Sequence, residues 1–378
     1  MKKVLILGGS HRDIPLIKAA QELGYFVITL GDRDYYLGHK YSDKSYLIDF
    51  NDLVVVERIY HDEAITFLLP GSGEESYFNT VKLADKLKIG NFDTLKVAQI
   101  VHNKWKFKDF CLSHNISTPN GFYYEDTYKN LYFPLVVKPT NLSGGRGVKI
   151  VHNEIELKQA LQVTKQHSQE IVLEEFIEGE LIAYSVIFEK QKISYAFCGA
   201  DVSYLNKYLI TTAYPIKIKK IVEKKLRKDL ELLAHKLHFV DGMFHAQVII
   251  KNDTPYLIDV TRRIAGDLYP QLIEKCDGIA YSKAVVESYT TGNITQNLLA
   301  TQHEFIIRHV VMPSQNGIYK KLFIDETVKE SIVYRFDLLQ EGENVKEFLH
   351  TQVTIVFIKG SKFLENLNNL IYPIMDKE

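Results

Sequence analysis

Residues 134–148, PLVVKPTNLSGGRGV, place a lysine at the end of a buried strand and a glycine-rich turn soon after it. The charge of Lys138 is costly in an apolar setting unless it meets an anion. The segment from Ser143 to Gly147 predicts a hairpin loop whose backbone N–H groups can face phosphate oxygens without obstruction by side chains. Its spacing is not that of a Walker loop, GxxxxGK[ST]. We therefore predict a hairpin that binds phosphate; the alternative is a flexible turn beside a lysine that reaches solvent.

Two different patterns precede this hairpin. Apolar strands and amphipathic helices alternate over the first ninety residues, beginning with KVLILGG at 3–9, and this alternation predicts a doubly wound α/β sheet. The glycines of GGSHRD at 8–13 depart from the GxGxxG spacing, so we do not expect NAD. They either serve a small molecule or only turn the strand into a helix. Residues 91–118 carry apolar residues at helical spacing and predict a linking helical segment.

Short strands dominate after the hairpin. They are joined by glycine turns and interrupted by helical patterns at 154–166 and 221–238, which predicts an α+β domain with antiparallel sheet. Beyond residue 302, three strand-like segments and a final apolar helix, FLENLNNLIYPIM at 363–375, predict a small closing subdomain. We therefore expect three domains, namely residues 1–92, 93–300 and 301–378.

The composition is that of an ordinary globular protein. The chain has 378 residues, 46% of them hydrophobic, and can bury the cores of two or three domains. Its 46 basic and 47 acidic residues show no long block of like charge, so nucleic acid is not an expected partner. No stretch approaches the roughly 18 apolar residues of a membrane span, and the first residues lack a signal core. Three widely spaced cysteines predict unpaired thiols in a reducing compartment, so we expect a cytoplasmic protein with no membrane partner.

Two further stretches carry residues suited to binding. VLEEFIEGE at 172–180 predicts a strand whose backbone can hydrogen-bond an adenine edge, followed by a carboxylate for ribose hydroxyls; the alternative is a solvated strand end. The stretch 245–261 predicts two neighbouring strands. Because residues two apart on a strand share a face, Gln247, Asp259 and Thr261 can converge there.

Together these stretches resemble the ATP-grasp superfamily over roughly residues 1–320. The matching motifs are Lys104 in HNKWKFKDF, then PLVVKPTNLSGGRGV, VLEEFIEGE and GMFHAQVIIKNDTPYLIDVTRR. Their order is similar to that of the branch that includes biotin carboxylase, the purine-pathway ATP-grasp enzymes and the L-amino acid ligases. The resemblance implies an N-terminal doubly wound pre-ATP-grasp domain, an ATP-grasp domain with antiparallel sheets and a small C-terminal subdomain. It also implies that ATP phosphorylates a carboxylate and that an amine then displaces the phosphate.

The resemblance assigns nucleotide contacts at the matching positions. Lys104 and Lys138 would contact ATP phosphates, with Lys106 and Lys108 as the alternatives to Lys104. Glu174 and Ile177 would meet adenine through their backbone, and Glu180 would take the ribose. The full set of expected nucleotide contacts is Lys104, Lys138, Ser143, Gly144, Gly145, Arg146, Gly147, Glu174, Glu175, Phe176, Ile177 and Glu180.

The expected metal ligands keep the family's spacing but differ from it in residue type. Gln247 and Asp259 stand where the family usually has Glu, and Thr261 stands where it usually has Asn. Mg²⁺ commonly uses only one or two carboxylates together with substrate phosphates and water, so these three oxygens can still hold it. We expect weaker binding of Mg²⁺, with Mn²⁺ as the alternative ion.

Four residues are expected to contact substrate. Arg263 matches a family arginine near the transferred phosphate or the substrate carboxylate, and with Lys138 it is the expected catalytic group; Arg262 is the spare. Asp267 would receive a substrate amine or cap the following helix. Arg308 is a candidate for a substrate carboxylate, and Glu75 is a further substrate candidate. His245 is expected to be structural.

The function that these assignments favour is an ATP-dependent carboxylate–amine ligase acting on small molecules, and a homodimer would fit such relatives. One alternative is an ATP-dependent carboxylase or a purine-pathway-like ligase, although the chain shows no biotin-accepting lysine motif. An alternative of another class is an ATP-binding sensor with weak or no turnover, suggested by the changes at the metal positions.

Overall fold

The computed structural model describes residues 1–124, 131–140, 147–166, 168, 170–206 and 209–376. The chain forms two compact units. The first combines Met1–Phe92, Gly199–Ile216 and Arg263–Glu378, and the second combines Asp93–Cys198 and Lys217–Arg262. One predicted domain boundary, after residue 92, coincides with the end of a segment of the first unit. The division into three domains remains a prediction.

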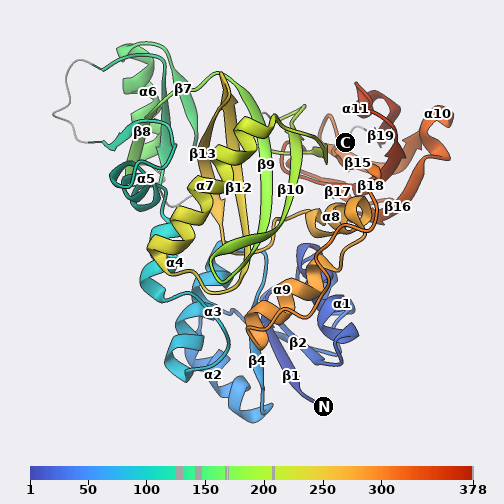
Figure 1. Cartoon of the computed structure of the whole chain (residues 1–378). Helices are drawn as coiled ribbons and strands as arrows, with labels where there is room; N and C mark the ends of the chain where they lie inside the picture. The colour runs from blue at the N-terminus through green and yellow to red at the C-terminus, as the bar shows by residue number, and fades with distance from the viewer. Residues whose placement is uncertain (125–130, 141–146, 167, 169, 207–208, 377–378) are drawn as a thin grey trace. The chain divides into compact units, whose positions relative to one another are not determined.

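The first unit begins with a parallel sheet. Its elements are β1 (Lys3–Leu7), η1 (His11–Asp13), α1 (Ile14–Glu22), β2 (Phe26–Gly31), η2 (Leu37–Lys40), β3 (Lys44–Leu47), α2 (Leu53–Asp62), β4 (Phe67–Pro70) and α3 (Glu74–Leu87). The strand order is β3-β2-β1-β4, with all pairs parallel (Figure 1). Leu5 and Leu7 pack with residues of α2 and α3, while the fully buried Val4 and Ile6 face the other side of the sheet. Both faces are covered, so the predicted doubly wound sheet is confirmed.

The rest of the first unit is built on antiparallel strands. Its elements are β11 (Thr212–Pro215), α8 (Tyr269–Asp277), α9 (Tyr281–Thr290), β14 (Phe305–Val311), β15 (Gly317–Ile324), α10 (Glu326–Lys329), β16 (Ile332–Asp337), β17 (Asn344–Val345), β18 (Thr354–Gly360), α11 (Leu367–Leu370) and β19 (Ile371–Asp376). Strands β11, β14, β18 and β16 are consecutive neighbours, and β17, β15 and β19 form a separate sheet. The predicted strands of this region are confirmed as β14, β16 and β18.

The predicted final helix is wrong for most of its length. Residues 363–375 contain only the single turn α11 before the chain extends into β19. Proline cannot occupy a helix interior, because it lacks an N–H and its ring clashes with the preceding turn. Pro373 instead lies on β19, an edge strand, where a missing N–H is tolerated.

The second unit joins two short helices to antiparallel sheets. Its elements are α4 (Leu95–His102), α5 (Lys104–Ser113), β5 (Gly121–Tyr123), β6 (Leu135–Pro139), β7 (Lys149–Val151), α6 (Glu154–Lys165), β8 (Ile171–Glu175), β9 (Glu180–Glu189), β10 (Lys192–Val202), whose last residues belong to the first unit, α7 (Lys220–Leu237), β12 (Gly242–Lys251) and β13 (Thr254–Thr261). One sheet has the order β5-β8-β6-β7, and β13, β12, β9 and β10 are neighbours in another. The helical patterns predicted at 154–166 and 221–238 are confirmed as α6 and α7.

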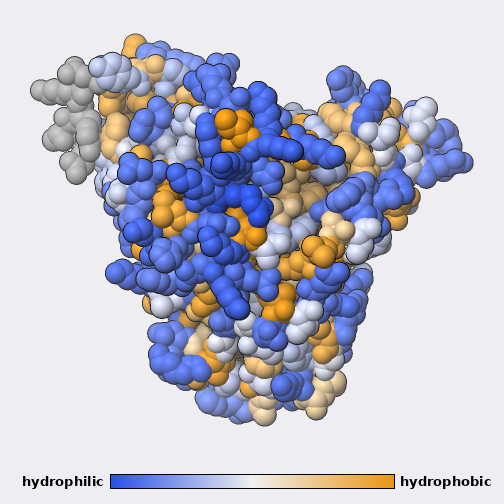
Figure 2. Space-filling model, viewed as in Figure 1, coloured by the Kyte–Doolittle hydropathy of each residue, from blue (hydrophilic) through white to orange (hydrophobic). Residues whose placement is uncertain are grey.

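The faces of these helices follow the sequence pattern. The apolar residues of α6, including Leu157 and Leu161, pack on Leu135 and Leu173 of the β5-β8-β6-β7 sheet. Helix α7 has one buried apolar face and one hydrophilic face. Figure 2 shows polar side chains gathered over this helix. Within the described ranges no helix is long and apolar enough to cross a membrane.

Candidate nucleotide and substrate sites

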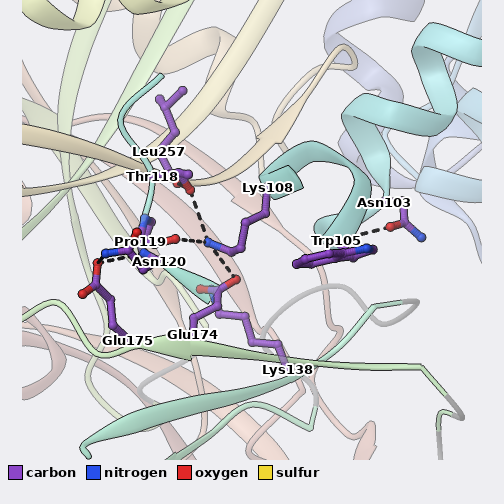
Figure 3. Close-up of polar contacts among 10 residues, drawn as sticks. All are labelled: Asn103, Trp105, Lys108, Thr118, Pro119, Asn120, Lys138, Glu174, Glu175 and Leu257. Carbon is purple, nitrogen blue, oxygen red and sulfur yellow. Dashed lines mark hydrogen bonds and ion pairs between the residues drawn. The ribbon is translucent and has the colours of Figure 1, made fainter. Parts of the chain in front are cut away.

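Two lysines and one glutamate form a buried cluster in the second unit (Figure 3). Lys138 Nζ lies 2.6 Å from Glu174 Oε2, and Lys108 Nζ lies 3.4 Å from Glu174 Oε1. The exposed fractions are only 3% for Lys108, 8% for Lys138 and 2% for Glu174. Three ionisable groups this deeply buried are unusual in a globular protein, so the cluster is the leading candidate for a binding site.

The sheet register explains why Lys138 and Glu174 meet. Strands β6 and β8 are antiparallel, with Val136 opposite Glu174 and Lys138 opposite Val172. Residues placed diagonally across two strands share a face and are within reach of long side chains. Lys138 therefore reaches back along the sheet to the Glu174 carboxylate.

Lys108 comes from the middle of α5. The helix begins at Lys104, and the side chain of Asn103 accepts hydrogen bonds from the N–H groups of Trp105 and Lys106. This N-cap fixes the start of the helix. Figure 3 shows Lys108 pointing from α5 toward the Glu174 carboxylate.

Lys108 is held by backbone and hydroxyl oxygens as well as by Glu174. Its Nζ donates to Pro119 O at 2.6 Å and to Thr118 Oγ1 at 3.3 Å, and Thr118 Oγ1 donates in turn to Leu257 O at 2.9 Å. A Cβ at Gly121 would lie 2.9 Å from Lys108 Cδ and 2.7 Å from a backbone oxygen of β8. The glycine thus leaves the space through which the lysine stem passes.

The electrostatics of the cluster favour a bound anion. Burial opposes ionisation of Glu174, but the positive charges of Lys138 and Lys108 outweigh it and hold the pKa of this carboxyl below its usual value. Burial also lowers the pKa of Lys108, against the opposing attraction of Glu174. With all three groups ionised, the cluster carries one net positive charge.

The strand end after Glu174 offers the groups expected to meet adenine and ribose. Its neighbour Glu175 is already engaged, because its carboxylate accepts from Asn120 N at 2.8 Å and its own N–H donates to Asn120 O. Phe176 N donates to Pro134 O at 3.2 Å. Among the residues that the structure describes, the N–H of Ile177 makes no hydrogen bond. Glu180 is exposed at the start of β9, where its carboxylate faces solvent.

The three expected metal ligands lie on one face of the β12–β13 pair. Gln247 is opposite Asp259, and His245 is opposite Thr261, with a bulge after Gln247. Asp259 is exposed, and its Oδ1 accepts the adjacent Val260 N–H. In the described ranges no three His, Cys, Asp or Glu side chains are grouped to hold a metal. An ion here would have one carboxylate, one amide oxygen and one hydroxyl.

The two neighbouring arginines behave differently. Arg262 is buried against Asp93 at 2.7 Å, donates to Met243 O and Val240 O, and lies 4.7 Å from the Phe239 ring. Its donors are occupied inside the second unit, so it is not available as the spare. Arg263 is half-buried and donates to Ile264 O at 3.2 Å. Arg263 therefore remains the predicted catalytic arginine.

A second group of charged residues lies within the first unit. Asp267 Oδ1 is 3.0 Å from Arg12 Nε and 3.5 Å from His11 Nε2. Arg308, only 2% exposed, donates to the backbone oxygen of Asp267 at 3.1 Å. Within the described ranges Arg308 Nε has no hydrogen-bond partner. A buried guanidinium with an unused donor is suited to a carboxylate ligand.

The pKa shifts of Asp267 and His309 agree with this geometry. Burial opposes ionisation of Asp267, but the charges of Arg12, His11 and Arg308 outweigh it and hold the pKa of this carboxyl far below its usual value. Burial, assisted by Arg308, lowers the pKa of His309 to about 3, so this histidine is neutral at pH 7. Asp267 is not the N-cap of α8, because that position is Leu268 and no side chain caps it.

The structure places the remaining predicted residues as follows. Lys104 is the half-buried first residue of α5, and Glu75 is exposed in the first turn of α3. Gly147 has a φ of +74°, which suits glycine. The predicted loop residues 143–146 lie outside the described residues. The roles of all these residues remain predictions.

Three residues of these two groups were not leading candidates in the sequence analysis, although the structure places them in the groups. Lys108 was only an alternative to Lys104, although their i, i+4 spacing places both on one side of a helix. His11 and Arg12 belong to GGSHRD, and their place directly after β1 in a doubly wound sheet was the available signal.

Comparisons with known proteins agree with the fold, and one family model matches the segment that contains the cluster. Residues 103–260 match the family model of the D-ala D-ala ligase C-terminus. D-alanine–D-alanine ligase A of Bacillus cereus is 30% identical over 169 residues, covering 42% of this chain and 54% of that protein. The chain thus spans about half the length of the curated relatives it first matches.

Several solved structures cover 95% or more of the chain. The L-amino acid ligase from Bacillus licheniformis has a TM-score of 0.83 at 18% identity, with 100% of this chain and 99% of that chain covered. The phosphoribosylglycinamide synthetase from Anaerococcus prevotii has a TM-score of 0.79 at 20% identity, with 99% and 100% covered. A biotin carboxylase domain from Hydrogenobacter thermophilus, solved with MgADP and bicarbonate, has a TM-score of 0.78 at 15% identity, with 95% and 86% covered.

Proposed function

We propose that this chain, which has the ATP-grasp fold, is an ATP-dependent ligase that joins a carboxylate to an amine. ATP phosphorylates the carboxylate to an acyl phosphate, and the amine displaces the phosphate to form an amide. The products are the amide, ADP and inorganic phosphate. The proposed substrates are small molecules, and a homodimer in the cytoplasm is part of the same proposal.

The buried cluster of Lys108, Lys138 and Glu174 is the observation that carries this proposal. It lies inside the segment 103–260 that matches a ligase family model. A lysine ammonium has three donors, and within the described ranges Lys138 uses one of them, on Glu174. Two donors are left for phosphate oxygens at the end of β6.

The neighbouring groups supply the other nucleotide contacts. Ile177 N–H would bind the adenine edge, and the exposed Glu180 would take ribose hydroxyls. Lys104 and the segment 143–147 would contact the phosphates. Phosphoryl transfer needs mainly positioning and neutralisation of charge, so no side-chain nucleophile is required.

Gln247, Asp259 and Thr261 would hold a divalent ion. Their oxygens are hard ligands on one strand face, and the Asp259 carboxylate is exposed, which suits Mg²⁺ that keeps water and phosphate ligands; Mn²⁺ is the alternative. When bound, the ion would neutralise negative charge on the phosphates. One protein carboxylate implies weak binding before ATP arrives.

Arg308 is the proposed carboxylate contact in the first unit. Its buried guanidinium has an unused Nε within the described ranges, whereas the Asp267 carboxylate is already paired with Arg12. Arg263 would approach the transferred phosphate or the same carboxylate. For Asp267 to bind a substrate amine, it would have to share its charge with Arg12 and His11.

A screen of amino acids and small acids in pairs, scored by release of ADP and phosphate, tests the proposal. The expected result is release that requires Mg²⁺, an acid and an amine together, with the amide found by mass spectrometry. Lys138→Ala should abolish this activity, while Lys96→Ala, which removes a lysine of α4 outside the cluster, should not. ATP binding without ADP release for every pair would indicate a sensor, and release driven by bicarbonate alone would indicate a carboxylase.

A further inference from the structure

We propose that Lys108 is a positioning residue that sets the affinity for nucleotide phosphates through Glu174. It neutralises the buried Glu174 carboxylate and so frees Lys138 to bind phosphate. The inference rests on the proposed function, because it takes ATP as the ligand of Lys138. It assigns a role to a lysine that has no direct contact with the ligand.

Lys108 is not itself placed to bind phosphate. Its three N–H donors are matched by three acceptors, namely Pro119 O, Thr118 Oγ1 and Glu174 Oε1. Its side chain is 3% exposed. A phosphate contact would require Lys108 to give up a buried hydrogen bond, which is costly.

Lys138 is the lysine that can change partners. Within the described ranges Glu174 is its only ion-pair partner. Without Lys108, the negative charge of Glu174 would be balanced by Lys138 alone. The pair of Lys138 and Glu174 would then have no net charge. A phosphate would then approach a neutral pair and not a cluster with one positive charge. Because charges interact strongly at short range in a protein interior, the loss of this positive charge should weaken phosphate binding.

The surroundings of Lys108 are built to keep it in this position. Thr118 connects it to Leu257 O on β13, and Gly121 leaves room for its methylene stem. These contacts belong to three separate strands or loops of the second unit. A lysine needed only for packing would not require a buried carboxylate opposite its charge.

The test compares three variants by direct nucleotide binding. Trp105 is the only tryptophan of the chain and lies on α5, three residues before Lys108, so its fluorescence reports binding near the cluster. Lys108→Met keeps the length and removes the charge. We expect it to weaken binding of a nonhydrolysable ATP analogue by roughly tenfold, while adenosine, which has no phosphate, binds as in the wild type.

The double variant Lys108→Met with Glu174→Gln provides the decisive comparison. It removes one positive and one negative charge, so Lys138 again supplies one net positive charge. We expect its affinity for the ATP analogue to return to within about threefold of the wild type. Glu174→Gln alone should bind the analogue at least as tightly as the wild type, because its cluster carries two positive charges.

The outcomes separate this inference from the proposed function. If the double variant is folded by circular dichroism and still binds as weakly as Lys108→Met, the charge role is overturned and Lys108 is structural. Equal loss of affinity for adenosine and for the ATP analogue would overturn the charge role as well. Lys96→Met, on the neighbouring α4, controls for loss of charge alone. A wild-type protein that binds no ATP at all would overturn the proposed function first.

Discussion

At the scale of single residues, burial distinguishes charged side chains that look alike in the sequence. The segment KWKFK at 104–108 contains three lysines with similar local sequence. Only Lys108 among them is buried, because it lies on the inward side of α5 beside Glu174. Arg262 and Arg263 are also neighbours in the sequence, but here the buried one, Arg262, is held by structural contacts. Burial of a charge therefore identifies a candidate site residue only together with its partners.

Gln247→Glu should tighten the binding of Mg²⁺. The change restores a second carboxylate next to Asp259, and carboxylates are the strongest oxygen ligands for this ion. We expect the Mg²⁺ concentration for half-maximal activity to fall by roughly tenfold. Gln99→Glu, which adds the same charge on the exposed side of α4, is the control. An unchanged Mg²⁺ titration would mean that position 247 is not a ligand.

Asp267→Asn should remove a pH-dependent part of the stability. The native pKa of Asp267 is far below its usual value, so its ion pairs stabilise the fold above the unfolded pKa of about 3.9 and this contribution is lost as the pH falls below it. Urea unfolding should show the variant about 3 kcal/mol less stable at pH 7. The difference from the wild type should shrink below about pH 4. A difference that stays constant from neutral pH into this acidic range would contradict the assignment.

At the scale of elements, the periodic segments could be predicted and the exceptions have local causes. The parallel sheet, α6 and α7 follow directly from hydrophobic periodicity. The last predicted helix failed because Pro373 and the pairing of β19 with β15 override its apolar pattern. The linking segment became two helices, since Asn103 is extended and caps the second one.

Asn103→Ala tests whether the start of α5 positions the lysines. Loss of the cap should cost about 1 kcal/mol of stability and weaken ATP binding, because Lys108 and Lys104 depend on this helix. Asp52→Ala is the matched control, since Asp52 caps α2 with two similar hydrogen bonds. It should lower stability to a similar extent and leave ATP affinity unchanged. Equal effects of both variants on ATP affinity would remove α5 from the site.

At the scale of the whole molecule, the fold is that of the ATP-grasp enzymes, as the order of motifs predicted. The candidate site was only partly predictable. The motifs predicted Lys138, Glu174 and the β12–β13 strand pair. The pairing of Asp267 with Arg12, in contrast, joins residues 255 positions apart. No local pattern reports such a contact, because it depends on how the first unit assembles from separate segments of chain.

Hydrogen exchange should show which of the two units each ligand protects. ATP at about one hundred times its Kd contributes about 2.7 kcal/mol, so the slowest amides of β6, β8 and α5 should exchange roughly a hundredfold more slowly. A carboxylate substrate should instead protect the segments around Asp267 and Arg308. The ATP effect should disappear in Lys138→Ala. Protection by ATP confined to the first unit would contradict the site.

The first unit is assembled from segments that are far apart in the chain, so it cannot be completed early during synthesis. Helix α9, Tyr281–Thr290, packs against α1 and β4. A chain emerging from the ribosome therefore carries a parallel sheet with one apolar face incompletely covered until α9 has been made. Exposed apolar surface of this kind promotes aggregation and recruits chaperones. The nascent N-terminal segment is thus expected to depend on chaperones until α9 has been synthesised.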